Sequence, residues 1–187
     1  MSFMLLGILN SQAAGGGGGA FDLLETTTLT TTTSSVTFSS LGAYSDYKHL
    51  QIRSVARNTV TNSGSSSLNI RFNGDTSTSY KKHGLAGNGS AVYSYTEVAD
   101  GKIVFESSVA DNGTTSGIYA PSVIDILDFS ASKNTTVRSM CGVAGIGNPT
   151  VQLQSGLYFK TAAVTSITLY GDWDFITGSR FSLYGVK

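Results

Sequence analysis

The sequence predicts an all-β fold: an antiparallel sandwich of two sheets with the jelly-roll arrangement. Apolar and polar residues alternate along most segments, as they do for Leu50 and Ile52 between Lys48 and Arg57. Turn residues separate these segments, as Asn73-Gly74-Asp75 does. Apolar residues nowhere keep helical spacing over three turns. About ten short strands at regular intervals are typical of such sandwiches.

The strand predicted to organise the others is Ser122–Phe129, the longest apolar run after the N-terminal segment. Near-continuous apolar strands are usually covered on both faces, so we expect this one to be buried on both. Asp125 and Asp128 interrupt the run. A buried carboxylate needs a hydrogen-bonded or charged partner, and we favour that structural role over catalysis.

The chain is expected to divide into an anchoring arm, residues 1–20, and one sandwich domain, residues 21–187. Five consecutive glycines, Gly15 to Gly19, form a hinge in the arm. A flexible linker is the alternative, but large apolar side chains left in water promote aggregation, so we expect the arm to insert into a neighbouring subunit. The predicted anchor residues are Phe3, Met4, Leu5, Leu6, Ile8 and Leu9.

The arm does not have the features of a membrane or export segment. Its apolar stretch is far too short to span a bilayer, and no Lys or Arg precedes Lys48, so the positive region of a signal peptide is missing. We therefore expect no membrane partner.

Charged residues make up 13% of the chain, against about 25% in typical soluble domains. This deficit predicts that other subunits cover part of the surface. The 12 basic residues balance the 12 acidic ones, so nothing indicates nucleic-acid binding. We expect no cofactor and no metal.

Two other stretches carry specific expectations. Thr26–Thr33 holds seven threonines and Leu29, a composition that favours an extended edge or inter-subunit strand. Thr76–Asp100 has weak periodicity and many small or polar residues, which predicts long loops with one or two short strands.

Two groups of residues could in principle support catalysis. Cys141 with His49 or His83 would be a nucleophile and base, but Cys141 falls on the inward face of a predicted strand, where free cysteine acts as a small hydrophobe. Asp172 and Asp174, flanking Trp173, could bind calcium or act as a glycosidase pair. Acids so close on a loop are mostly turn residues, so we expect no enzyme.

Aromatic residues near predicted loops have two interpretations that remain open. They could stack on sugar rings, because an aromatic face is apolar while its edge is wet, or they could line subunit contacts, where tyrosine is enriched. The residues concerned are Tyr44, Tyr47, Tyr80, Tyr93, Tyr95 and Trp173.

From about Phe21 onward the order of several segments resembles a family of small proteins encoded by tailed bacteriophages. The segments are Phe21–Glu25, Ser35–Ser40, Tyr47–Arg53, Arg71–Asp75, Ser122–Asp128 and Ser182–Lys187. The resemblance implies a virion component, either a tail-fibre or fibre-like module or a capsid-decorating protein. The shared motifs are turn and core residues, so no catalytic or binding residue is carried over.

Together these observations predict a non-enzymatic virion structural protein, assembled in the host cytoplasm. It would associate as a homotrimer and dock onto other virion proteins through its arm. The alternative is a receptor-binding module for host-surface polysaccharide, used in host attachment. A glycan-cleaving enzyme is the third possibility.

Overall fold

The computed structural model describes residues 19–61, 64–113, 115–144 and 149–187. The predicted anchor residues Phe3, Met4, Leu5, Leu6, Ile8 and Leu9 lie outside the described part. Strands and one short 3-10 helix, Leu41–Tyr44, are the regular elements of the described part, so the all-β prediction is confirmed. No helix within these ranges is long and apolar enough to cross a membrane.

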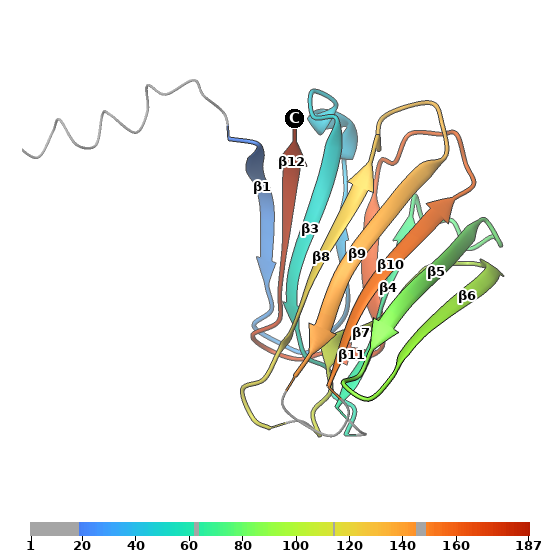
Figure 1. Cartoon of the computed structure of the whole chain (residues 1–187). Helices are drawn as coiled ribbons and strands as arrows, with labels where there is room; N and C mark the ends of the chain where they lie inside the picture. The colour runs from blue at the N-terminus through green and yellow to red at the C-terminus, as the bar shows by residue number, and fades with distance from the viewer. Residues whose placement is uncertain (1–18, 62–63, 114, 145–148) are drawn as a thin grey trace, which may run out of the picture.

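The strands are arranged in two antiparallel sheets (Figure 1). The larger sheet has eight strands in the order β1-β12-β3-β8-β9-β10-β5-β6, and the smaller sheet has four in the order β2-β11-β4-β7. In chain order the strands are β1 (Phe21–Thr28), β2 (Thr33–Phe38), β3 (His49–Ala56), β4 (Ser65–Phe72), β5 (Tyr80–Gly87), β6 (Val92–Asp100), β7 (Ile103–Ala110), β8 (Ala120–Leu127), β9 (Thr135–Val143), β10 (Thr150–Tyr158), β11 (Ile167–Phe175) and β12 (Arg180–Val186).

The jelly roll is visible in the strand order. The four strands β1-β12-β3-β8 face β2-β11-β4-β7, which is the arrangement of an eight-stranded, double Greek-key sandwich. Two additions, β9-β10 and β5-β6, extend the larger sheet beyond this unit. Figure 1 shows these strands continuing the front sheet to the right, past the smaller sheet behind it.

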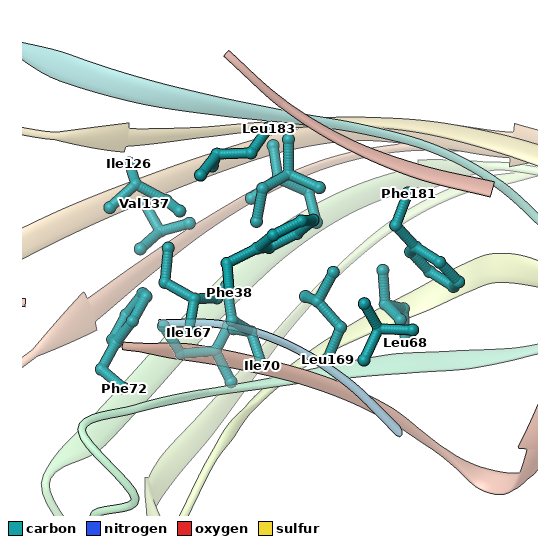
Figure 2. Packing of buried hydrophobic residues seen from close by; sticks show 14 of the residues in the cluster. Phe38, Leu68, Ile70, Phe72, Ile126, Val137, Ile167, Leu169, Phe181 and Leu183 are labelled. Carbon is teal, nitrogen blue, oxygen red and sulfur yellow. The ribbon is translucent and has the colours of Figure 1, made fainter. Parts of the chain in front are cut away.

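The core lies between the two sheets. Figure 2 shows Phe38, Leu68, Ile70, Phe72, Ile167 and Leu169 of the smaller sheet packed against Ile126, Val137, Phe181 and Leu183 of the larger one. All ten side chains are fully buried. The alternation read from the sequence therefore marks the inward face of these strands.

The predicted central strand is only half covered. β8 alternates between buried residues, such as Ile124 and Ile126, and partly exposed ones, such as Val123 and Leu127. The expectation that it is buried on both faces is wrong, because among the described residues no second layer packs against the outer side of the larger sheet. Its apolar outer residues belong to the surface of the sheet.

The stretch Thr76–Asp100 was also predicted wrongly, because it contains the full-length hairpin β5-β6 rather than loops with short strands. Here the usual pattern is reversed: Lys82 and Gly84 point inward and are buried, while Leu85 is 50% exposed on the outer face. Sequence periodicity predicts a half-buried strand only when apolar residues occupy the inward positions, so it does not predict β5, where the inward positions are polar.

The threonine-rich stretch Thr26–Thr33 lies at sheet edges, as expected. It covers the end of β1, an edge strand of the larger sheet, and reaches the start of β2, an edge strand of the smaller one. Leu29 between them is buried. The expected role of Thr26–Thr33 in subunit contacts stays a prediction.

The one-sided burial of β8 predicts different costs for neighbouring substitutions. Ile124→Ala should lower the free energy of unfolding by about 2–5 kcal/mol, because a fully buried side chain is removed. Val123→Ala, one residue away on the outer face, should cost less than about 1 kcal/mol. Urea unfolding followed by circular dichroism measures both; equal losses would contradict the one-sided burial.

Candidate functional site

A polar pocket opens on the smaller sheet, over three strands that are neighbours in it. Its floor is the start of β4, and its walls come from β7 on one side and β11 on the other. The cavity has a volume of about 250 Å³. The residues that line it are Val60, Ser65, Ser66, Ser67, Glu106, Ser107, Asp172 and Trp173.

The β11 wall is a bulge that projects an aromatic side chain. Pairing with β2 is regular up to Tyr170 and resumes only at Phe175. Gly171 permits the excursion, because a Cβ there would lie 2.6 Å from the carbonyl oxygen of Trp173. Thr59 N–H donates to Asp174 O at 3.0 Å and fixes the far end. Trp173 is left 42% exposed.

The β7 wall carries a second irregularity. The register between β4 and β7 shifts between Ser66 and Leu68. Opposite the shift, Ser107 has a φ of 54°, in the left-handed region that non-glycine residues rarely adopt. Bulges and sparsely populated backbone conformations of this kind cluster beside functional sites.

Glu106 is the carboxylate of the β7 wall, and its charge is held by two donors. Lys82 Nζ lies 2.8 Å from Oε1, and Ser67 Oγ donates to Oε2 at 2.6 Å. Burial alone would raise the pKa of Glu106, but the hydrogen bonds from Lys82 and Ser67 outweigh it and lower the pKa below its usual value. Glu106 is therefore ionised at neutral pH.

The hydroxyl of Ser107 is held by side chains of the larger sheet. Gln152 Nε2 donates to Ser107 Oγ at 2.9 Å, and Tyr95 OH donates to Gln152 Oε1 at 2.5 Å. Tyr95 lies across Gly84, where an added Cβ would be 2.5 Å from the tyrosine ring. Ser65 Oγ donates to Ser107 Oγ at 3.3 Å. The polar wall is thus fixed before any ligand arrives.

Asp172 supplies a second carboxylate, from the β11 bulge. Asn69 Nδ2, on the adjacent strand β4, donates to its Oδ1 at 3.1 Å, and Lys102 Nζ lies 3.7 Å from the same oxygen. The pocket therefore combines an exposed indole with carboxylates and serine hydroxyls. These groups suit a ligand that has an apolar face and several hydroxyl groups.

Sequence reasoning identified Trp173 and Asp172 but missed Glu106 and the serines of β4. Asp174 does not line the pocket. The sequence signal that could have identified Glu106 as a site residue is that it is the single charged residue of β7. Ser65 and Ser66 belong to a run of serines without apolar alternation, so the sequence gives no strand signal there, although β4 begins at Ser65.

The predicted tyrosines separate into three groups. Tyr80 is fully buried, its pKa is raised to about 12 by that burial, and it stacks on Tyr158 at 4.7 Å, so its predicted role in surface contacts is wrong. Tyr44 and Tyr47 pack against the core and are partly buried. Tyr93 and Tyr95 remain accessible on β6, with ring centroids 6.4 Å apart.

Three other residues singled out in the sequence have structural roles, whereas His83 is exposed on β5. Cys141 is buried, and burial raises the pKa of its thiol, as expected for a core residue. His49 Nδ1 instead accepts the backbone N–H of Asp128 at 2.9 Å. Asp125 accepts hydrogen bonds from Gln51 and Arg138, at 2.8 Å and 3.2 Å, but on the partly exposed outer face of β8 rather than in the buried position that was expected.

No group of three or more metal-ligating side chains occurs among the described residues.

Two effects change the pKa of Asp128: the hydrogen bond from Lys133 lowers it, and burial raises it. The Lys133 hydrogen bond is the larger effect, so the pKa is lowered below its usual value.

A second surface feature lies on the outer face of the larger sheet. Four apolar residues are directly opposite one another on adjacent strands, and we call them the apolar row: Val123 (β8), Met140 (β9), Leu153 (β10) and Leu85 (β5). Met140, Leu153 and Leu85 are 61%, 58% and 50% exposed. Val151, 60% exposed on β10, widens the row.

No model of a known protein family matches the chain, and no curated protein matches it. Among solved structures, the chain is similar to the CBM40 module of a Ruminococcus gnavus IT-sialidase bound to α2,6-sialyllactose, with 14% identity, coverage of 91% of this chain and 95% of that chain, and a TM-score of 0.33. An alginate lyase from a Chlorella virus shows 11% identity, coverage of 96% and 97%, and a TM-score of 0.18. Similarities at these scores carry no argument about function.

The lowered pKa of Glu106 predicts a pH-dependent contribution to stability. Because the folded pKa is below the unfolded value near 4.5, the contribution is complete above about pH 4.5 and is lost as pH falls through the folded pKa. Glu106→Gln should cost about 2–3 kcal/mol at pH 7, because it removes the carboxylate paired with the Lys82 ammonium, whose side chain is 2% exposed. The cost should be lower than for a fully buried pair because the Glu106 side chain is 38% exposed.

Urea unfolding of wild type and Glu106→Gln at pH 7 and pH 3 measures this effect, and the difference between them should shrink at pH 3. Glu25→Gln, on the exposed part of β1, is the control and should leave the pH dependence near that of wild type. A difference that does not change with pH would contradict the charge-based contribution.

Proposed function

We propose that this chain is a non-enzymatic structural subunit of a tailed-bacteriophage particle, in a fibre-like appendage or as a capsid decoration. The resemblance of its segment order to small phage proteins supports the placement in a virion. The apolar row supports self-association, and it is the observation that carries the proposal.

The row needs a partner because it is continuous. Isolated exposed apolar side chains are normal on a soluble protein, but contiguous apolar patches mark interaction sites. Here the cross-strand register places Met140, Leu153 and Leu85 side by side on adjacent strands. Only 13% of the residues in the chain are charged, so few charged side chains are available to keep this apolar surface soluble in the monomer.

The occupant we propose is a second copy of the chain. Beside the row, Arg138 on β9 pairs with Asp125 on β8 at 3.2 Å, so the neighbouring charges compensate each other. The formal net charge of the chain is zero, so two copies do not repel each other at long range. Three copies around a symmetry axis can each bring this face to the axis, in a closed homotrimer.

In this proposal, residues 1–20 attach the chain to the particle. The segment Phe3–Leu9 is apolar, and a glycine-rich stretch separates it from β1. Burial of such a segment against another virion protein would stabilise docking. The sandwich would then project from the particle.

Self-association through the row predicts a change in mass when the row is charged. Met140→Lys combined with Leu153→Lys should convert a trimer of 19.5 kDa chains into monomers, because buried unpaired ammonium groups are costly. Size-exclusion chromatography with light scattering measures the mass. Leu23→Lys is the matched control, since Leu23 on β1 is 59% exposed and Leu153 is 58% exposed. A wild-type monomer, or a double variant of unchanged mass, would contradict the proposal.

The anchoring role predicts that removing residues 1–20 separates folding from incorporation. The shortened chain should keep the circular dichroism and thermal transition of the full chain, because β1 begins at Phe21. It should no longer enter particles when it replaces the full chain during phage assembly. Particle proteomics provides the readout, and unchanged incorporation would exclude the anchor.

A second candidate function is recognition of host-surface polysaccharide, and the pocket with Trp173 is the observation that favours it. Binding fits the pocket better than cleavage does. A glycosidase acid needs a raised pKa to hold its proton at neutral pH, whereas the pKa of Glu106 is lowered. Structural and receptor-binding roles are compatible in one subunit.

A further inference from the structure

We propose that the pocket between β7 and β11 binds an uncharged pyranose unit of a polysaccharide and discriminates against acidic sugars. The proposal rests on the second candidate function, polysaccharide recognition, and assigns its site and ligand class. Neither the apolar row nor the arm takes part in it.

The aromatic contact comes from Trp173. Its indole is 42% exposed although it is a large apolar side chain, and the β11 bulge holds it at the rim of the cavity. The C–H face of a pyranose ring can lie on such a surface while its hydroxyls remain hydrogen-bonded. The cavity of about 250 Å³ is smaller than the roughly 300–1,000 Å³ of pockets that enclose drug-sized ligands, so it suits one unit of a longer chain.

The polar groups of the pocket are carboxylates, which accept hydrogen bonds, and serine hydroxyls, which lie near them. Glu106 is ionised, and an ionised carboxylate has about four lone-pair sites, of which Lys82 and Ser67 occupy two. Its remaining sites can accept sugar hydroxyls, as can those of Asp172 across the cavity. Ser65 and Ser66 can act as donors or acceptors. Charge-assisted hydrogen bonds of this kind are stronger than neutral ones.

The exclusion of acidic sugars follows from the same carboxylates. A sugar carboxylate in the cavity would lie near Glu106 and Asp172, and the lining residues include no Lys or Arg. The two nearby ammonium groups are already paired, Lys82 with Glu106 at 2.8 Å and Lys102 with Asp172 at 3.7 Å. Like charges brought together at a binding site disfavour the wrong partner.

The pocket is also rigid enough for recognition. Ser107 is fixed by Gln152, which is itself held by Tyr95, so the wall connects both sheets. Gly171 and the left-handed Ser107 set the backbone of the two bulges. A preformed site loses little conformational freedom on binding, which favours affinity.

The test uses the full chain and isothermal titration calorimetry with two sets of hexasaccharides. The uncharged set contains gluco-, manno- and galacto-oligosaccharides, and the acidic set contains oligoalginate and oligogalacturonate. We expect at least one uncharged ligand to bind about tenfold or more tightly than every acidic one. Trp173→Ala should then weaken binding by about tenfold or more.

Phe159→Ala is the matched control, because Phe159 is 41% exposed, as Trp173 is, but does not line this pocket. It should leave the affinity unchanged. Glu106→Gln should weaken uncharged ligands and reduce the discrimination against acidic ones, with circular dichroism confirming that each variant is folded.

The possible failures are distinguishable. Absence of binding to every saccharide would overturn both polysaccharide recognition and this site. Binding that survives Trp173→Ala would leave polysaccharide recognition standing and overturn the pocket. Tighter binding of the acidic set would overturn the assigned ligand class.

Discussion

The structure depends on a mismatch in width between its two sheets. The larger sheet has eight strands and the smaller one four, so β9, β10 and β5 pack against β7, the edge strand of the smaller sheet. An edge presents polar groups rather than a flat apolar layer. Lys82 is 3% exposed there, and its ammonium would be costly to bury without Glu106 of β7. The ion pair therefore closes the open side of the sandwich and also places a carboxylate in the pocket.

The same mismatch explains which parts of the fold could be predicted. Where the two sheets face each other, as at Leu50 and Ile52, burial follows the apolar alternation that predicts a strand there. Where the larger sheet passes the β7 edge, polarity is reversed, with Lys82 and Gln152 inside and Leu85 outside. Periodicity is informative only when the inner face is apolar, so the sequence of β5-β6 predicts long loops with one or two short strands instead of a full-length hairpin.

The candidate site was less predictable because its residues come together only through the fold. Trp173 drew attention as the lone tryptophan, and Asp172 as its neighbour. Glu106 and Ser65 are distant from both in the chain and belong to no motif; they meet because β4 lies between β11 and β7 in the smaller sheet. Tyr80 shows the opposite error: it was predicted to make surface contacts, but it is buried. Its hydroxyl forms hydrogen bonds with backbone groups inside the core, including one to Phe72 O at 3.2 Å.

The two proposed surfaces do not compete for space. Residues of the apolar row point away from the core on the larger sheet, whereas the pocket opens on the smaller sheet beside β11. Association through the row would cover apolar side chains and leave Trp173 accessible to solvent. In a trimer each subunit would then present its own pocket outward. Several weak sugar contacts held in one assembly bind a repeating polysaccharide far more tightly than a single contact does. Under the two proposed functions, one subunit would in this way combine a structural role with attachment to a host surface.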